Sequence, residues 1–122
     1  MGYYGQRDMT GITALLAGVV RRLEALQVAA TEPYNFGIAP GLVTSDTPGT
    51  SVTGGLAPYT FNWTYVSGEP GFSISSTTEQ NPTWSFFFDT PSIVSAVWRV
   101  TVNDSAGSAP VTLDITITLS TL

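Results

Sequence analysis

Apolar and polar residues alternate along most of the second half of the chain. The clearest run is Val111–Leu119, in which Val, Leu and Ile occupy every second position and Thr or Asp the positions between. The same two-residue period, or a short piece of it, recurs in four other runs: Tyr59–Tyr65, Phe72–Ser75, Thr83–Phe88 and Ala96–Val102. Successive side chains of a strand point to opposite faces, so this period predicts half-buried β-strands. We expect one or two further strands between Ile38 and Thr53.

Short half-buried strands separated by turns predict two sheets packed face to face. We therefore expect a mainly β protein, in which an immunoglobulin-like antiparallel β-sandwich over residues 42–122 follows an N-terminal α-helix. Trp63 stands on the third strand, where sandwiches of the immunoglobulin type carry a core Trp. The expected core residues are Phe61, Trp63, Trp98, Val100, Val102, Ile115 and Ile117.

The first part of the chain has a different period. Apolar residues recur there at intervals of three and four, which predicts an amphipathic helix from about Gly11 to Ala30 with Thr10 as its N-cap. The expected apolar face consists of Ile12, Leu15, Leu16, Val19, Val20, Leu23 and Leu26. Such a stripe is too apolar to stay in water, so we expect it to attach to a partner or to other copies of the chain. Pro and Gly residues in Glu32–Pro40 end the helix, and this stretch is either a linker or a first edge strand. Residues 1–41 are thus assigned to an arm, the helix and a linker.

Charge separates the two parts further. The chain has 122 residues, of which 43% are hydrophobic and 11% charged, and this suits one domain with an appendage. The net charge of −5 lies entirely in residues 42–122, whereas residues 1–41 carry three Arg against three acids. No basic stripe is present, so we expect no nucleic-acid partner.

The apolar stretch from Ile12 to Val20 is not expected to enter a membrane. It is shorter than the ~20 apolar residues that span a bilayer. Asp8 precedes it and Arg21 and Arg22 follow it, which is the reverse of the polarity of a secretory signal. Together with the absence of Cys, this favours folding in a reducing cytosol.

The residue types that most catalytic sites require are missing. The chain has no His, Cys or Lys, and its acidic residues are scattered over turns and outward strand positions. We therefore predict no enzyme activity, no catalytic residues, no metal ligands and no cofactor. Asp104, with Asn103 and Ser105, could offer oxygen atoms to Ca²⁺, but we favour a turn in which Asp104 accepts hydrogen bonds from nearby amides, because the turn fully explains this segment.

Four aromatic residues have two alternative roles, in the core or in a platform that stacks on sugars: Tyr59, Tyr65, Trp84 and Phe87. We favour the core for most of them, because aromatic residues at alternate strand positions are usually inward. Phe87 is the exception, because Phe86 and Phe88 are expected to point inward and Phe87 then points outward. An exposed Phe indicates a contact surface.

Three segments carry a resemblance to a known family. Gly54–Trp63 reads GGLAPYTFNW and is followed by Val66–Gly68, Asn81–Thr83 leads into the next aromatic strand, and Trp98–Gly107 reads WRVTVNDSAG. In order and spacing they resemble the immunoglobulin-like domains of tailed-bacteriophage structural proteins and, more loosely, polycystic-kidney-disease-type repeats. The resemblance spans residues 51–119 and leaves out the predicted helix.

This resemblance implies a virion component, assembled in the host cytoplasm, with no enzymatic activity. We expect an accessory decoration or fibre-like protein of head or tail, in which the helix attaches and the sandwich is displayed. Its partners would be other virion proteins and copies of itself. The alternative is a host-surface adhesion or carbohydrate-binding module, with weak binding to host glycans.

Overall fold

Two long antiparallel strands, β8 (Ser92–Asn103) and β9 (Val111–Thr121), form the centre of the protein. The computed structural model describes residues 24–122, and within this range the chain forms nine strands and no helix. The other strands are β1 (Gln27–Ala29), β2 (Tyr34–Gly37), β3 (Gly41–Thr44), β4 (Ser51–Thr53), β5 (Thr60–Gly68), β6 (Ser73–Ile74) and β7 (Trp84–Phe88). All five strands expected from the two-residue period are present, and the stretch between Ile38 and Thr53 supplies two more.

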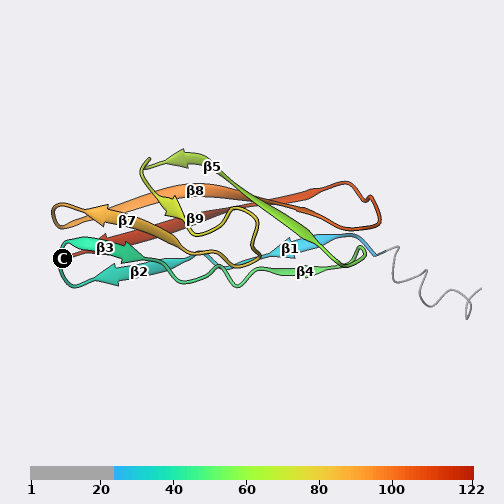
Figure 1. Ribbon diagram of the computed structural model, residues 1–122, viewed down its shortest axis with the longest axis horizontal. Helices are drawn as coiled ribbons and strands as arrows, with labels where there is room; N and C mark the ends of the chain where they lie inside the picture. Colours follow the sequence, from blue (N-terminus) through green and yellow to red (C-terminus); the bar gives the residue numbers. More distant parts are fainter. Residues whose placement is uncertain (1–23) are drawn as a thin grey trace, which may run out of the picture.

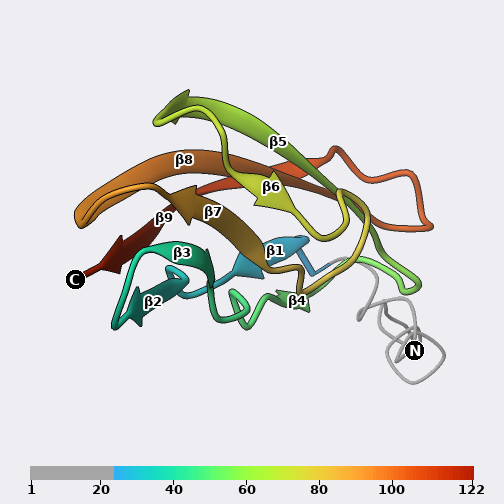
Figure 2. The ribbon, with the colours of Figure 1, turned by 60° about the vertical axis from the view of Figure 1, so that its left-hand side comes forward.

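The strands form an elongated sandwich of the immunoglobulin type (Figures 1 and 2). One layer is a four-stranded sheet in the order β2-β9-β8-β5, and the other is a three-stranded sheet in the order β3-β7-β6. A separate pair, β1 with β4, continues the second layer toward one end (Figure 2). The sandwich is not wholly antiparallel, because the edge strand β2 runs parallel to β9.

Three tryptophans lie at the centre of the core. Trp63 and Trp84 pack edge to face with ring centroids 5.2 Å apart, and Trp98 lies 6.0 Å from Trp84. The indole N–H of Trp63 donates to the backbone oxygen of Glu79 at 2.8 Å, so this donor is satisfied although the ring is almost fully buried. Six of the expected core residues are buried as predicted, and Phe61 is partly buried against them.

The chain joins the sandwich earlier than the sequence indicated. The helix expected to run to Ala30 is wrong over residues 24–30, none of which is helical, and Gln27–Ala29 is strand β1. Leu26, expected on the attachment face, is instead buried in the core. Of the two alternatives for Glu32–Pro40, the edge strand is observed as β2 and the linker is wrong, so the expected boundary at residue 42 moves toward the N-terminus. The other six residues of the predicted apolar face lie outside the described residues: Ile12, Leu15, Leu16, Val19, Val20 and Leu23.

Candidate interaction surfaces

The chain enters the sandwich through a tightly held segment at one end. The backbone oxygen of Glu24 accepts a hydrogen bond from the amide of Gly55 at 3.1 Å. Leu26 then enters the core, and β1 pairs with β4. We call this region, with the neighbouring β8–β9 turn, the junction end. The entering segment is therefore fixed to the sandwich by backbone pairing and by a buried side chain.

Two adjacent glycines make this close approach feasible. Gly54 and Gly55 both have positive φ, +72° and +58°, a conformation that L side chains rarely adopt. A Cβ at Gly54 would overlap the backbone oxygen of Ala25, and one at Gly55 would lie 2.6 Å from the Asp104 carboxylate. Gly54 thus admits the backbone of the entering segment, and Gly55 leaves room for the side chains of Leu26 and Asp104.

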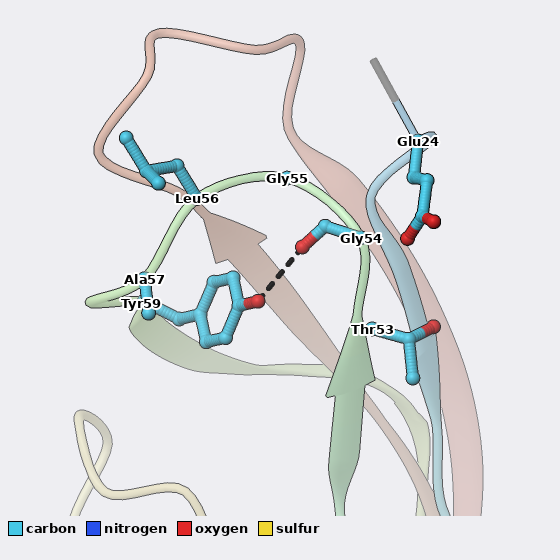
Figure 3. A pocket seen from close by; sticks show the side chains of 7 residues that line it. All are labelled: Glu24, Thr53, Gly54, Gly55, Leu56, Ala57 and Tyr59. Carbon is cyan, nitrogen blue, oxygen red and sulfur yellow. Dashed lines mark hydrogen bonds between the residues drawn. The ribbon is translucent and has the colours of Figure 1, made fainter. Parts of the chain in front are cut away.

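A shallow hollow of about 420 Å³ lies beside these glycines (Figure 3). Glu24 and Thr53 line one side, and Tyr59 lines the other, where its hydroxyl donates to the backbone oxygen of Gly54 at 2.7 Å. This bond indicates that Tyr59 stabilises the β4–β5 loop and is not part of a sugar platform. The hollow adjoins the entering segment, so it belongs to the junction and carries no chemistry of its own.

Asp104 organises the turn on the other side of the junction. Its carboxylate accepts bonds from the hydroxyl and amide of Ser108 at 2.7 and 3.0 Å, from the amide of Leu56 at 3.0 Å and from the amide of Ala106 at 3.3 Å. The hydrogen bond from the Ser108 side chain is the main cause that holds the pKa of Asp104 below its ordinary value. The turn hypothesis thus accounts for Asp104. The described residues contain no group of three or more acids that could hold a metal ion.

The opposite end of the sandwich, which we call the tip, is formed by the β2–β3 and β7–β8 turns (Figure 1). Large apolar side chains are exposed there. Phe87 is 61% exposed and lies opposite Leu42, 69% exposed, in the β3–β7 register. Ile93, at the start of β8, is 68% exposed. The outward orientation predicted for Phe87 is therefore observed, and Leu42 extends its apolar surface on the same sheet.

A groove of about 280 Å³ opens on this tip. We call it the tip groove, and its main lining residues are Glu69, Phe86, Phe87, Phe88, Asp89 and Val94. Thr90 and Ser92 also line it, so its lining is mixed, with Phe87 as the exposed aromatic residue and two exposed carboxylates, Glu69 and Asp89. The one ion pair found among residues 24–122 joins Arg99 to Asp114 in the middle of the four-stranded sheet. The groove therefore combines apolar surface with negative charge that the described domain leaves without a cation.

The aromatic residues considered for a sugar-binding platform are mostly buried or held by contacts within the sandwich. Trp84 is fully buried, so the core role that we favoured for it is confirmed and its alternative role in a sugar platform is excluded. Tyr65 is 46% exposed, but its ring packs edge to face on Trp98 at 5.9 Å and its hydroxyl donates to the backbone oxygen of Gly68. Of the four aromatic candidates, Phe87 alone is both exposed and without a hydrogen bond or ring contact of this kind, and it lines the tip groove.

Comparisons with known proteins support the fold. No family model matches this sequence, and no curated protein matches it. Among solved structures, the chain is similar to the ASH / PapD-like domain 7 of human CEP192, with a TM-score of 0.54, 10% identity, and coverage of 79% of this chain and 85% of that one. The PKD domain of human KIAA0319 aligns with a TM-score of 0.44 and 18% identity over 83% of this chain and 84% of that one. The titin M3 domain aligns with a TM-score of 0.38 and 17% identity over 80% of this chain and 98% of that one.

The similarity to the CEP192 domain shows an immunoglobulin-type fold. A fold does not determine a function, so the function has to be inferred from the surface residues. Within residues 24–122, no helix has the length and apolar character needed to cross a bilayer. The junction end and the tip groove lie at the two ends of the sandwich.

Proposed function

We propose that this protein is a non-enzymatic virion structural protein of a tailed bacteriophage, an accessory or fibre-like component of head or tail. Residues 1–23 attach it, and the sandwich is displayed. One observation supports this proposal above the others, namely the fixed entry of the chain at the junction end. A segment that leaves a rigid end of an elongated domain is suited to hold that domain at a set angle to its support.

The apolar stripe of residues 1–23 supplies the reason for attachment. Ile12, Leu16, Val19 and Leu23 recur at the spacing of one helix face. An isolated helix of ~20 residues with such a face is marginal in water, so it gains stability by packing on a partner. The sandwich carries the negative charge that keeps a displayed domain soluble.

The test is incorporation into particles. Mass spectrometry of purified phage particles should detect the parent chain, whereas Leu16→Asp with Leu23→Asp should be missing from them while its far-UV circular dichroism still shows a folded sandwich. Gln6→Asp with Thr13→Asp adds the same charge away from the stripe and serves as the control, with normal incorporation. Absence of the parent chain from particles, or normal incorporation of the stripe variant, would contradict the proposal.

A further inference from the structure

We propose that the tip groove of one copy receives residues 1–23 of a neighbouring copy, so that the protein assembles head to tail. This inference rests on the proposed attaching role of residues 1–23 and names another copy of the chain as one of its partners. Three features of the molecule support it: the composition of the groove, the composition of the segment, and the distance between the groove and the junction.

The groove requires an occupant that is apolar and positively charged. Phe87 gives it an exposed aromatic side chain, and Glu69 and Asp89 place two carboxylates beside it. Cations over aromatic faces and beside carboxylates are stabilised by both groups. An acidic or purely polar partner would leave the exposed apolar surface uncovered, and an acidic one would be repelled by the two carboxylates.

The described domain cannot supply such an occupant. Residues 24–122 contain one basic residue against eight acidic ones, which leaves a net charge of −7. That basic residue, Arg99, is engaged by Asp114 through two hydrogen bonds of 2.7 and 3.0 Å. A contact between two sandwiches alone would therefore bring together surfaces of the same sign.

The first 23 residues have the required chemistry. They contain the other three Arg residues of the chain, and Arg21 and Arg22 directly precede the apolar residue Leu23. Val19 and Leu16 extend the apolar face on the N-terminal side of this pair. Two adjacent cations beside an apolar stripe match two carboxylates beside the exposed Phe87.

Chain length requires that this pair comes from a different copy. Glu24 is held at the junction end by Gly55, whereas the groove includes Val94 near the opposite end of β8. A strand of 12 residues spans roughly 35–40 Å, and Figures 1 and 2 place the two regions at opposite ends of the sandwich. Arg22 lies two residues before Glu24, so even fully extended backbone brings it at most about 7 Å from that point. The groove of the same copy is out of its reach.

Such a contact is heterologous, because two different surfaces meet. An open chain of copies keeps one free groove and one free segment at its ends, so it grows into a filament unless the rotation between copies closes it into a ring. On a particle, the terminal segment remains available to the particle surface, and each further copy attaches to the groove of the one before.

Charge reversal tests this assembly in the full chain. We expect sedimentation velocity and light scattering to show that the parent has a mass above the 12.9 kDa of one chain, rising with concentration. Glu69→Arg with Asp89→Arg, and separately Arg21→Glu with Arg22→Glu, should each reduce the mass to a single chain at concentrations where the parent assembles. An equimolar mixture of the two variants should assemble again, because each segment then meets a groove of opposite charge.

The control is Asp46→Arg with Glu79→Arg, two exposed acids outside the groove, which makes the same change of charge and should assemble as the parent does. Circular dichroism checks that every variant is folded. A parent that stays a single chain at all concentrations, reversed variants that assemble unchanged, or a mixture that stays monomeric would each overturn the proposal. A monomeric parent found in particles would overturn head-to-tail assembly and leave the proposed function intact.

Discussion

Replacing Trp63 with Ala is the sharpest test of the core. The side chain is 1% exposed, packs edge to face on Trp84 and donates to the backbone oxygen of Glu79. Truncating a buried aromatic side chain removes its burial and leaves a cavity, at a cost of about 3–5 kcal/mol. A domain of this size is stable by only about 5–15 kcal/mol, so the variant should be close to unfolding.

Urea denaturation followed by tryptophan fluorescence and circular dichroism measures this cost. With a slope of about 2 kcal/mol per molar urea, a loss of about 4 kcal/mol lowers the midpoint by about 2 M. Trp63→Phe keeps an aromatic ring against Trp84 but loses the donor to Glu79, and should cost about 1–3 kcal/mol. The difference between the two variants separates packing from the hydrogen bond.

The matched control is Phe87→Ala, which removes an aromatic side chain that is 61% exposed. Its free energy of unfolding should stay within about 0.5 kcal/mol of the parent's, as for most surface substitutions. A Trp63→Ala curve that overlays that of the parent would refute the placement of this residue in the core. A large loss for Phe87→Ala would refute the distinction between core and tip.

Three further predictions concern the junction end. Residues 24–122 expressed alone should give a cooperative thermal transition, whereas 42–122 should melt at a lower temperature because it lacks β1, β2 and Leu26; equal melting temperatures would contradict this. Gly54→Ala should lower the melting temperature more than Gly107→Ala, because both have positive φ but only Gly54 faces backbone within contact distance, and equal losses would show that φ strain alone acts. Asp104→Asn should destabilise the protein at pH 7. Since folding lowers the pKa of Asp104, its contribution is complete above the unfolded value of about 3.9 and disappears as the pH falls through the folded value. Thermal melts of variant and parent should therefore begin to approach each other below about pH 4 and coincide only below the folded pKa.

The long strands could be predicted from the sequence because local alternation determines them. In Val111–Thr121 the inward residues Ile115, Ile117 and Leu119 are buried, as the two-residue period indicates. The outward position of Phe87 followed from the same rule. Burial of Trp84 follows from the rule as well, since it shares a face with Phe86 and Phe88.

The short strands could not be predicted in this way. Gln27–Ala29 has three residues, and its neighbour Leu26 lies three positions after Leu23, where the spacing of a helix face would also place an apolar residue. Partners distant in sequence decide the outcome, because β1 pairs with Ser51–Thr53 and Leu26 finds a place in the core. The apolar spacing of a helix therefore continues in the sequence to Leu26, although pairing with β4 makes the next residues, Gln27–Ala29, a strand.

The tip groove could not be predicted from the sequence either, because it also depends on residues that are distant in sequence. Glu69 and Asp89 stand on different turns and, taken singly, are typical solvated charges. Topology brings them to one groove, because β5 ends at the end of the sandwich where β7 turns into β8. The one local feature of the sequence that indicated the tip groove was the outward position of Phe87 in the two-residue alternation.

The fixed junction also decides what kind of assembly a head-to-tail contact would produce. A flexible linker would let each copy take a different angle to the next, and the result would be irregular chains. Here Leu26 is buried, the oxygen of Glu24 is bonded to Gly55, and Gly54 lies against the backbone of Ala25, so the entering segment has little freedom to turn. If the groove holds residues 1–23 as firmly, every step repeats the same rotation and translation. Repetition of one operation yields a ring or a regular helix, and electron micrographs of concentrated parent protein should show one of these two forms rather than branched aggregates.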